Sequence, residues 1–239
     1  MTNQPATHPV NATFGFVDLA GFTALTEAHG DAEAVALLDR FRVIATEALG
    51  PDDRLVKTIG DAVMLVFPGP DAAIVATTRL FTELADTDLP VARAGLHHGS
   101  AIEHNGDYLG ASVNLTARIA GQARGAQVLA TTEVAETARR HGVTVVDLGC
   151  FELRNMAERV QLFQIEVCPA AAGTVIDPVC RMQVPRSDAA GRLRHRNRDY
   201  WFCSLRCAAA FTADPDRLAS LPADDAIPAA HDGGPGNAG

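Results

Sequence analysis

Two aspartates, Asp18 and Asp61, stand at the ends of strand-like runs and could bind a divalent cation. Residues 12–17 form an apolar run that ends at Asp18, and Asp61 lies between the strand-like runs 54–59 and 62–67. Paired carboxylates favour Mg²⁺ or Mn²⁺, hard cations that bind oxygen ligands and often share phosphate oxygens with a substrate. Taken singly, each residue would more commonly be a turn or helix-capping aspartate.

The segment that follows Asp18 could bind an anion. The first N–H groups of a helix have no partner within the helix, so a helix beginning here would direct them at a phosphate. A glycine in the segment allows the backbone to bend tightly before the helix. We expect the segment to cradle a triphosphate; its residues are Ala20, Gly21, Phe22 and Thr23.

Four other polar residues could recognise a nucleotide. Lys57 is the only lysine of the chain and stands four residues before Asp61, where its compact ammonium group suggests a specific donor. Asp107 lies in a loop that contains glycine. Asn114 and Arg118 are four residues apart, so on a helix they share one face. Each of these residues, taken singly, could be an ordinary surface residue.

Together these residues resemble the catalytic domain of the class III nucleotidyl cyclases. The similarity covers about residues 12–167, and all six positions expected in an active member of the family are filled. It runs through Phe16-Val-Asp-Leu-Ala-Gly-Phe-Thr23, Val56-Lys-Thr-Ile-Gly-Asp61, Asp107-Tyr-Leu-Gly and Val113-Asn-Leu-Thr-Ala-Arg118.

The resemblance implies that Asp18 and Asp61 bind two Mg²⁺ or Mn²⁺ ions and that Lys57 and Asp107 recognise adenine. Hydrogen-bond chemistry agrees, because adenine offers an acceptor at N1 for the ammonium group and a donor at its N6 amine for the carboxylate. Guanine would place its O6 acceptor against the carboxylate. Such a mismatch in a buried site costs ~1–3 kcal/mol per unsatisfied group, so ATP is the predicted substrate.

The resemblance further implies that Asn114 and Arg118 orient the ribose and stabilise charge on the transferring phosphoryl group. It also implies a head-to-tail homodimer, in which one chain supplies the metal ligands of a site and the other chain supplies the nucleotide-recognising residues. In that family a phosphate-binding lysine often occurs late in the domain. Arg154 is the nearest candidate here, and its role is left open.

The order of predicted elements indicates an α+β fold. Between residues 12 and 96 strand-like runs and helical periodicities follow one another as β, α, β, β, α, β. This is the split βαβ or ferredoxin-like arrangement, an antiparallel sheet with helices on one face. The remaining elements are expected as helices over 112–123 and 133–140 and as strands over 127–130 and 143–166.

The composition indicates a globular chain. It has 239 residues, a net charge of −9 and 47% apolar residues, with no apolar run of the ~18 residues that a membrane span requires. We expect no signal peptide, no membrane partner and a cytoplasmic location. Nucleic acid is not an expected partner, because the chain is acidic and one strand face is expected to carry only four alternating arginines. These are Arg192, Arg194, Arg196 and Arg198.

A second resemblance, to the YHS domain, covers residues 174–220 and includes Arg181 where that family usually has glycine. The thiols of Cys180, Cys203 and Cys207 suit a soft or borderline metal, Cu(I) or Zn²⁺, with His195 available as a fourth ligand. A purely structural role of buried cysteines is the alternative. The resemblance runs through Asp177-Pro-Val-Cys-Arg-Met182 and Tyr200-Trp-Phe-Cys-Ser-Leu-Arg-Cys207.

The sequence therefore predicts an adenylate cyclase that forms 3′,5′-cyclic AMP and pyrophosphate and responds to metal or redox state through the YHS module. One alternative is a catalytically silent protein of cyclase fold that binds a nucleotide or senses a metal, and another is a guanylate cyclase. A diguanylate cyclase is not favoured, because its Gly-Gly-Asp/Glu-Glu-Phe signature is missing. The predicted parts are a disordered N-terminus (1–11), the cyclase domain (12–168), a linker (169–173), the YHS module (174–220) and a disordered tail (221–239).

Overall fold

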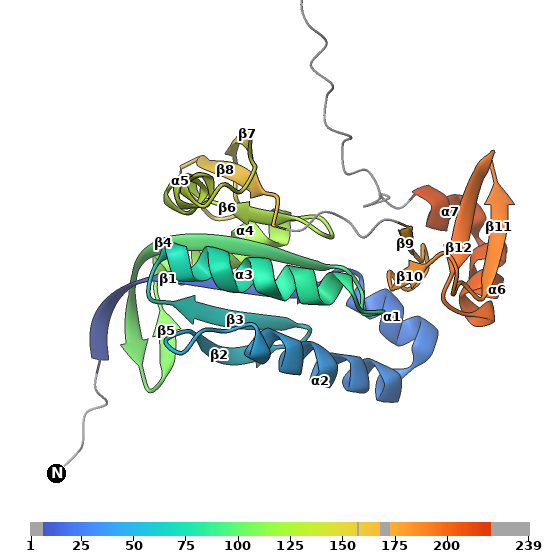
Figure 1. Cartoon of the computed structure of the whole chain (residues 1–239), viewed down its shortest axis with the longest axis horizontal. Helices are drawn as coiled ribbons and strands as arrows, with labels where there is room; N and C mark the ends of the chain where they lie inside the picture. Colours follow the sequence, from blue (N-terminus) through green and yellow to red (C-terminus); the bar gives the residue numbers. More distant parts are fainter. Residues whose placement is uncertain (1–6, 157, 168–172, 221–239) are drawn as a thin grey trace, which may run out of the picture.

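The computed structural model describes residues 7–156, 158–167 and 173–220 (Figure 1). The predicted tail 221–239 and most of the predicted linker lie outside the described residues. The larger, N-terminal part contains β1 (Thr7–Leu19), α1 (Phe22–His29), α2 (Asp31–Glu47), β2 (Arg54–Ile59), β3 (Ala62–Phe67), α3 (Pro70–Ala85), β4 (Ala92–His104), β5 (Asp107–Leu109), α4 (Ala111–Gln122), β6 (Val128–Ala130), α5 (Thr132–Arg140), β7 (Val145–Phe151) and β8 (Val160–Ile165).

One mixed sheet organises this part of the chain. Its strand order is β2-β3-β1-β4-β6-β8-β7, with β5 paired to β4 outside that path. The β4–β6 pair is parallel and the other pairs are antiparallel. The prediction of an α+β fold with a largely antiparallel sheet is confirmed, whereas β5 was expected as a loop.

The β2–β3 hairpin was predicted residue for residue, and Asp61 lies at its tip. Gly60 in the turn has a φ of 61°, a backbone conformation that glycine adopts without steric cost. A bulge between Leu55 and Lys57 brings Lys57 into register with Met64. Two apolar strands joined by a glycine-containing turn form a locally encoded unit, which explains the agreement.

The disordered N-terminus predicted for residues 1–11 is wrong for residues 7–11. They extend β1 and pair with the second half of β4, from Thr7 opposite His104 to Asn11 opposite Ser100. These residues are poor in large apolar groups, but β4 is long enough to offer them backbone hydrogen-bond partners. Residues 1–6 lie outside the described part of the chain.

Helices cover both faces of the sheet. As predicted, α2 and α3 share one face, where they pack on Val17 and Leu65. Helix α4 lies on the opposite face. It packs there against Phe14 and Phe16 of β1 and against side chains of β4 and β5. Because side chains alternate along a strand, β1 supplies apolar groups to both layers. The expectation of helices on one face therefore holds for α2 and α3 and is wrong for α4.

A smaller C-terminal module packs beside α1 (Figure 1). Phe202, Cys207 and Phe211 of the module belong to the same buried cluster as the core of the larger part. The four arginines expected on one strand face are divided between two strands and the turn that joins them, where Arg196 has a positive φ. The elements of the module are β9 (Thr174–Ile176), β10 (Gln183–Pro185), β11 (Gly191–His195), β12 (Arg198–Phe202), α6 (Leu205–Ala213) and α7 (Pro215–Ser220).

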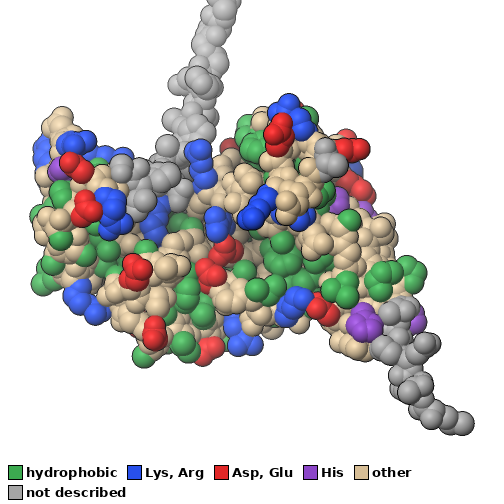
Figure 2. Space-filling model, turned by 180° about the vertical axis from the view of Figure 1, so that it is seen from behind, with side chains coloured by type: hydrophobic (Ala, Val, Ile, Leu, Met, Phe, Trp, Pro, Cys, Tyr) green, Lys and Arg blue, Asp and Glu red, His purple; other side chains and the backbone are tan. Residues whose placement is uncertain are grey.

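Among the helices of the described residues, none has both the length and the apolar character needed to cross a membrane. Basic and acidic side chains are interspersed over the face shown in Figure 2, with apolar side chains exposed between them.

Candidate active site

The structure brings Asp18 and Asp61 together at one end of the sheet. Asp18 near the end of β1 is paired with Ala62, the first residue of β3, and Asp61 directly precedes that residue. Burial first, and then the negative charge of Asp18, raises the pKa of Asp61 to about 6. Among the described residues, no hydrogen-bond donor is found for the buried Oδ1 atom of Asp18. Two crowded carboxylates with an unpartnered oxygen form a donor set that fits a divalent cation.

Arg93 of β4 is a functional candidate that the sequence reasoning missed. Its Nε and Nη2 atoms donate to Oδ2 of Asp18 at 2.9 and 2.6 Å, and its Nη1 donates to the carbonyl oxygen of Ala123 at 3.2 Å. Arg93 therefore links the carboxylate to the end of α4 and partly neutralises it. Nothing in the sequence around Arg93 distinguishes it from an ordinary strand arginine, because its partners are distant in sequence.

The predicted phosphate-binding segment is confirmed as the start of a helix, but one of its amides is already bonded. The N–H of Ala20 donates to the carbonyl oxygen of Val91 at 2.8 Å, so Ala20 is removed from the anion site. Gly21 caps α1 with a φ of 78° and without a side-chain cap. Among the described residues, no backbone hydrogen bond is found from the amides of Phe22 and Thr23, as is usual for the first turn of a helix.

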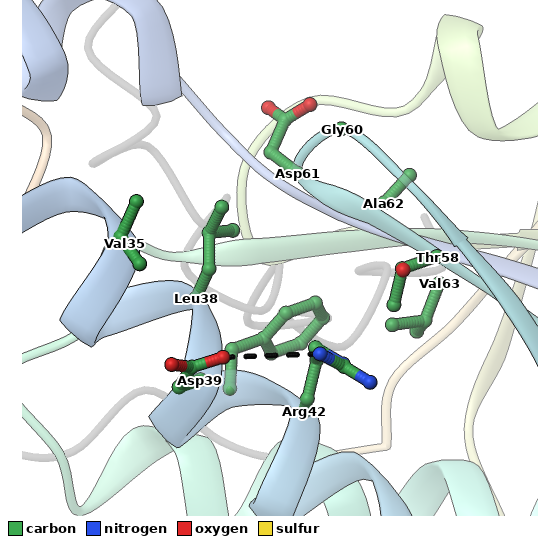
Figure 3. A pocket seen from close by; sticks show the side chains of 10 residues that line it. Val35, Leu38, Asp39, Arg42, Thr58, Gly60, Asp61, Ala62 and Val63 are labelled. Atoms are coloured by element: carbon green, nitrogen blue, oxygen red, sulfur yellow. Dashed lines mark ion pairs between the residues drawn. The ribbon is translucent and has the colours of Figure 1, made fainter. Parts of the chain in front are cut away.

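A pocket of about 130 Å³ lies between α2 and the β2–β3 hairpin (Figure 3). Asp61 lies at its edge, and its carboxylate points away from the ion pair of Asp39 and Arg42. Binding pockets for drug-sized ligands usually measure ~300–1,000 Å³. This pocket in a single copy is therefore too small for a nucleoside triphosphate.

Lys57 and Asp107, which are 50 residues apart, form an ion pair with 2.5 Å between Nζ and Oδ2. The hydrogen bond from Lys57 lowers the pKa of Asp107 and keeps it ionised. The second oxygen of Asp107 accepts the N–H of Tyr108 at 2.8 Å, and the Tyr108 ring packs edge-on against Phe14. Strand β5 thus holds the Asp107 carboxylate beside Lys57.

Asn114 and Arg118 lie one turn apart on α4, as predicted. Arg118 contacts the sulfur of Met156 at 3.4 Å, and Asn114 is exposed. Helix α4 approaches β4 closely at Gly95, where a Cβ atom would lie 2.3 Å from the backbone nitrogen of Ala120. The missing side chain of Gly95 therefore sets the height of α4 above the sheet.

The predicted site residues form two groups. Asp18 and Asp61 lie together, and Lys57 and Asp107 lie together, but among the described residues no direct hydrogen bond or ion pair joins these two pairs to each other or to Asn114 and Arg118. One copy of the chain therefore presents the predicted site residues as two pairs and two helix residues without direct bonds between them.

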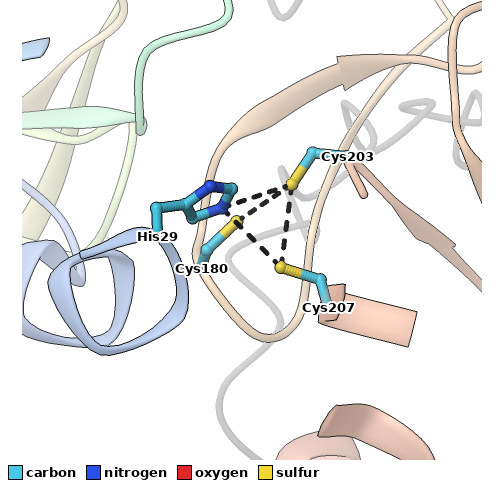
Figure 4. A group of neighbouring side chains, drawn as sticks. All are labelled: His29, Cys180, Cys203 and Cys207. Atoms are coloured by element: carbon cyan, nitrogen blue, oxygen red, sulfur yellow. Dashed lines mark hydrogen bonds between the residues drawn. The ribbon is translucent and has the colours of Figure 1, made fainter. Parts of the chain in front are cut away.

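The three cysteines of the module lie together, with a histidine that was not predicted (Figure 4). Each of Cys180, Cys203 and Cys207 offers its sulfur to the cluster, and the fourth member is His29 at the end of α1. His195, the suggested fourth ligand, instead pairs with Asp216 at 2.8 Å. Hydrogen bonds from the thiols of Cys180 and Cys203 lower the pKa of Cys207, which favours a thiolate in this cluster.

Known proteins are similar in sequence to the larger, N-terminal part of the chain. The model of the adenylate and guanylate cyclase catalytic domain matches residues 5–167. The pH-sensitive adenylate cyclase MT1302 of Mycobacterium tuberculosis is 36% identical over 159 residues, which are 64% of this chain and 40% of that protein. An adenylate cyclase of Glutamicibacter nicotianae is 33% identical over 133 residues, 55% of this chain and 33% of that protein. The chain thus spans less than half the length of these two relatives.

Solved structures show the same fold. An adenylate cyclase of Trypanosoma brucei in its monomeric state aligns with a TM-score of 0.59 and 22% identity over 67% of this chain and 89% of that one. The adenylyl cyclase CyaB of P. aeruginosa aligns with a TM-score of 0.57 and 18% identity over 70% of this chain and 98% of that one.

Proposed function

We propose that this chain, which belongs to the family of the adenylate and guanylate cyclase catalytic domain, converts ATP to 3′,5′-cyclic AMP and pyrophosphate. The observation that carries the proposal is the pairing of Lys57 with Asp107. The only lysine of the chain and a fixed, ionised carboxylate lie side by side, and they complement the two Watson–Crick groups that distinguish adenine from guanine.

On binding, adenine would replace the hydrogen bond between Lys57 and Asp107 with one hydrogen bond to each of these side chains. Both side chains are more than a third exposed, and an exposed ion pair is worth only ~0–1 kcal/mol, so separating its members costs little. Lys57 would then donate to N1, while Asp107 accepts a hydrogen bond from the N6 amine. Guanine would place its O6 acceptor against the carboxylate of Asp107, so that two acceptors would face each other.

The chemistry is an in-line displacement within one nucleotide. The ribose 3′-hydroxyl gives up its proton to solvent as its oxygen attacks the α-phosphorus, the bond between that phosphorus and the oxygen bridging to the β-phosphate breaks, and pyrophosphate leaves. Asp18 and Asp61 would hold Mg²⁺ or Mn²⁺, two ions per site, which when bound lower the proton affinity of the 3′-hydroxyl and neutralise phosphate charge. Asn114 orients the ribose, and Arg118 stabilises the charge that builds on the α-phosphoryl group.

A complete site requires a second copy of the chain. In a head-to-tail homodimer, Asp18 and Asp61 of one protomer would face the base-reading pair and α4 of its partner. The pocket of about 130 Å³ beside Asp61, which is too small for a nucleoside triphosphate in one copy, supports this arrangement. So does an exposed apolar pair beside Asp107, since Leu109 and its cross-strand neighbour Ile102 are 53% and 41% exposed.

The C-terminal module is proposed to be a YHS module whose cysteines bind a soft or borderline metal and modulate the cyclase. Three clustered sulfur atoms, one of them in a thiol of lowered pKa, support metal binding.

Purified protein incubated with Mn²⁺ and either ATP or GTP, with products identified by mass spectrometry, tests the function. Cyclic AMP formed in preference to cyclic GMP is expected. Equal rates with both nucleotides would contradict the roles of Lys57 and Asp107. A folded protein that binds ATP without forming a cyclic product would instead be a silent member of the family.

A further inference from the structure

His29 is the C-terminal residue of α1 and belongs to the cyclase domain, whereas the three sulfur atoms that lie to one side of its ring come from the C-terminal module (Figure 4). The His29 side chain is only 6% exposed. Its Nε2 atom lies 3.6 Å from the sulfur of Cys203 and 3.7 Å from that of Cys207. The sulfur of Cys203 lies 3.4 Å from that of Cys180 and 3.7 Å from that of Cys207.

These four of the six separations are close to those around one tetrahedral ion. With Zn–S bonds of about 2.3 Å and Zn–N bonds of about 2.0 Å, tetrahedral angles place sulfur atoms about 3.8 Å apart and sulfur and nitrogen about 3.5 Å apart. All four ligand atoms lie within 4.8 Å of one another. We propose that His29, Cys180, Cys203 and Cys207 bind one zinc ion, which joins the C-terminal module to helix α1 of the cyclase domain.

The residues around the cluster hold its ligands in place. The Nδ1 atom of His29 lies 3.3 Å from a carboxylate oxygen of Glu33, which directs Nε2 toward the sulfur atoms, as a carboxylate does for many zinc-bound histidines. Asp177 is fully buried and accepts the backbone N–H groups of Val179 and Cys203, each at 2.8 Å. One carboxylate therefore holds the turn before Cys180 and the backbone of Cys203, two residues before α6, which carries Cys207.

Zinc at this position would act on the phosphate-binding end of α1. The helix has only eight residues, lacks a side-chain N-cap and has Leu25 as its one fully buried residue, so its own stability is low. Its first residue follows Gly21, and a Cβ atom at Gly21 would lie 2.2 Å from Cγ of Arg181, the neighbour of Cys180. The module thus contacts α1 at both ends, through the metal cluster and through Arg181.

This coupling rests on the proposed cyclase activity, whereas the zinc site extends the proposed metal binding of the module and can be tested without that activity. A bond from zinc to His29, the last residue of α1, would order the helix and the amides at its start, which face the triphosphate. We expect zinc to lower the KM for ATP several-fold, and to slow hydrogen exchange of the α1 amides in the absence of nucleotide.

Zinc binding is tested by titrating the reduced, chelator-stripped full chain with Zn²⁺ in competition with a chromogenic chelator. One zinc per chain is expected, and Co²⁺ in its place should show the absorption of a tetrahedral thiolate site. His29→Ala should weaken zinc binding by at least about 100-fold, since even partners outside the ligand set contribute 10- to 100-fold. Two control variants should bind zinc like the wild type. His195→Ala removes a histidine of the C-terminal module that lies outside the cluster, and Cys150→Ser removes an exposed cysteine.

Cys203→Ser provides a second ligand variant in case His29→Ala does not fold. Absence of zinc binding by the wild type, or wild-type affinity in His29→Ala, would overturn the four-ligand site. If zinc binds but neither the hydrogen exchange of α1 nor the KM for ATP responds, the link to α1 is wrong. If no condition yields a cyclic nucleotide, the proposed function fails, while the titration and the exchange experiment still decide the zinc site.

Discussion

In the metal-free protein, ionisation of Asp61 should lower stability as the pH rises toward neutrality. Burial and the charge of Asp18 raise the pKa of Asp61 from 3.8 to about 6. Between about pH 4 and pH 6 the folded chain therefore retains a proton that the unfolded chain has released. The free energy of unfolding falls with rising pH across this window, and the contribution of this group is constant above it.

The expected size follows from the two pKa values. For a fully buried carboxyl, a pKa of about 6 in place of 3.8 corresponds to about 3 kcal/mol. Asp61 is only partly buried, and screening by solvent reduces the expected penalty to about 1–1.5 kcal/mol. A divalent cation held by Asp18 and Asp61 removes their repulsion, so Mn²⁺ should stabilise the chain more at pH 7 than at pH 5.

Urea denaturation of the wild type and of Asp61→Asn, in chelator and across pH 4–7.5, measures this effect. Asparagine cannot ionise, so the variant should exceed the wild type in stability by about 1–1.5 kcal/mol at pH 7 and match it near pH 4. Asp52→Asn, in an exposed turn, controls for the loss of a carboxylate elsewhere. A difference between Asp61→Asn and wild type that does not vary with pH would refute the reasoning.

Three further predictions concern packing, the base and the missed arginine. Gly95→Ala places a Cβ atom 2.3 Å from a backbone nitrogen of α4 and should lower the free energy of unfolding by about 1–3 kcal/mol in denaturant titrations. Gly121→Ala, which meets no neighbouring atom, should raise it by about 0.5–1 kcal/mol. In competition assays, Lys57→Ala and Asp107→Ala should each reduce the preference for ATP over GTP about ten- to a hundred-fold, and unchanged preference would contradict base recognition. Arg93→Met removes two charged hydrogen bonds from Asp18 and should lower the free energy of unfolding by about 1.5–3 kcal/mol, measured by thermal denaturation. Arg42→Met, which removes an exposed ion pair with Asp39, is the control.

The parts of the fold that sequence predicted best are encoded locally. The hairpin around Asp61 combines two apolar runs with a glycine turn, so it was located correctly. The position of Asp18 beside Asp61 follows from the pairing of β1 with this hairpin.

The parts that could not be predicted depend on tertiary contacts. Arg93 meets Asp18 across 75 residues, and His29 meets Cys203 across 174 residues. Neither arginine nor histidine stands in a distinctive local pattern, so only the docking of strands and of the module reveals their roles. Ala20 was wrongly assigned to the phosphate site because its bond to Val91 is equally non-local.

A mixing experiment with Asp18→Ala and Arg118→Ala tests most directly whether catalysis uses residues of two copies. Each variant alone should be inactive as a homodimer, because both of its sites lack one essential group. After equal mixing and subunit exchange, half of the dimers are mixed and each carries one intact site, so about a quarter of wild-type cyclic AMP formation should return. No recovery in a mixture that demonstrably contains the mixed dimer would contradict the shared site.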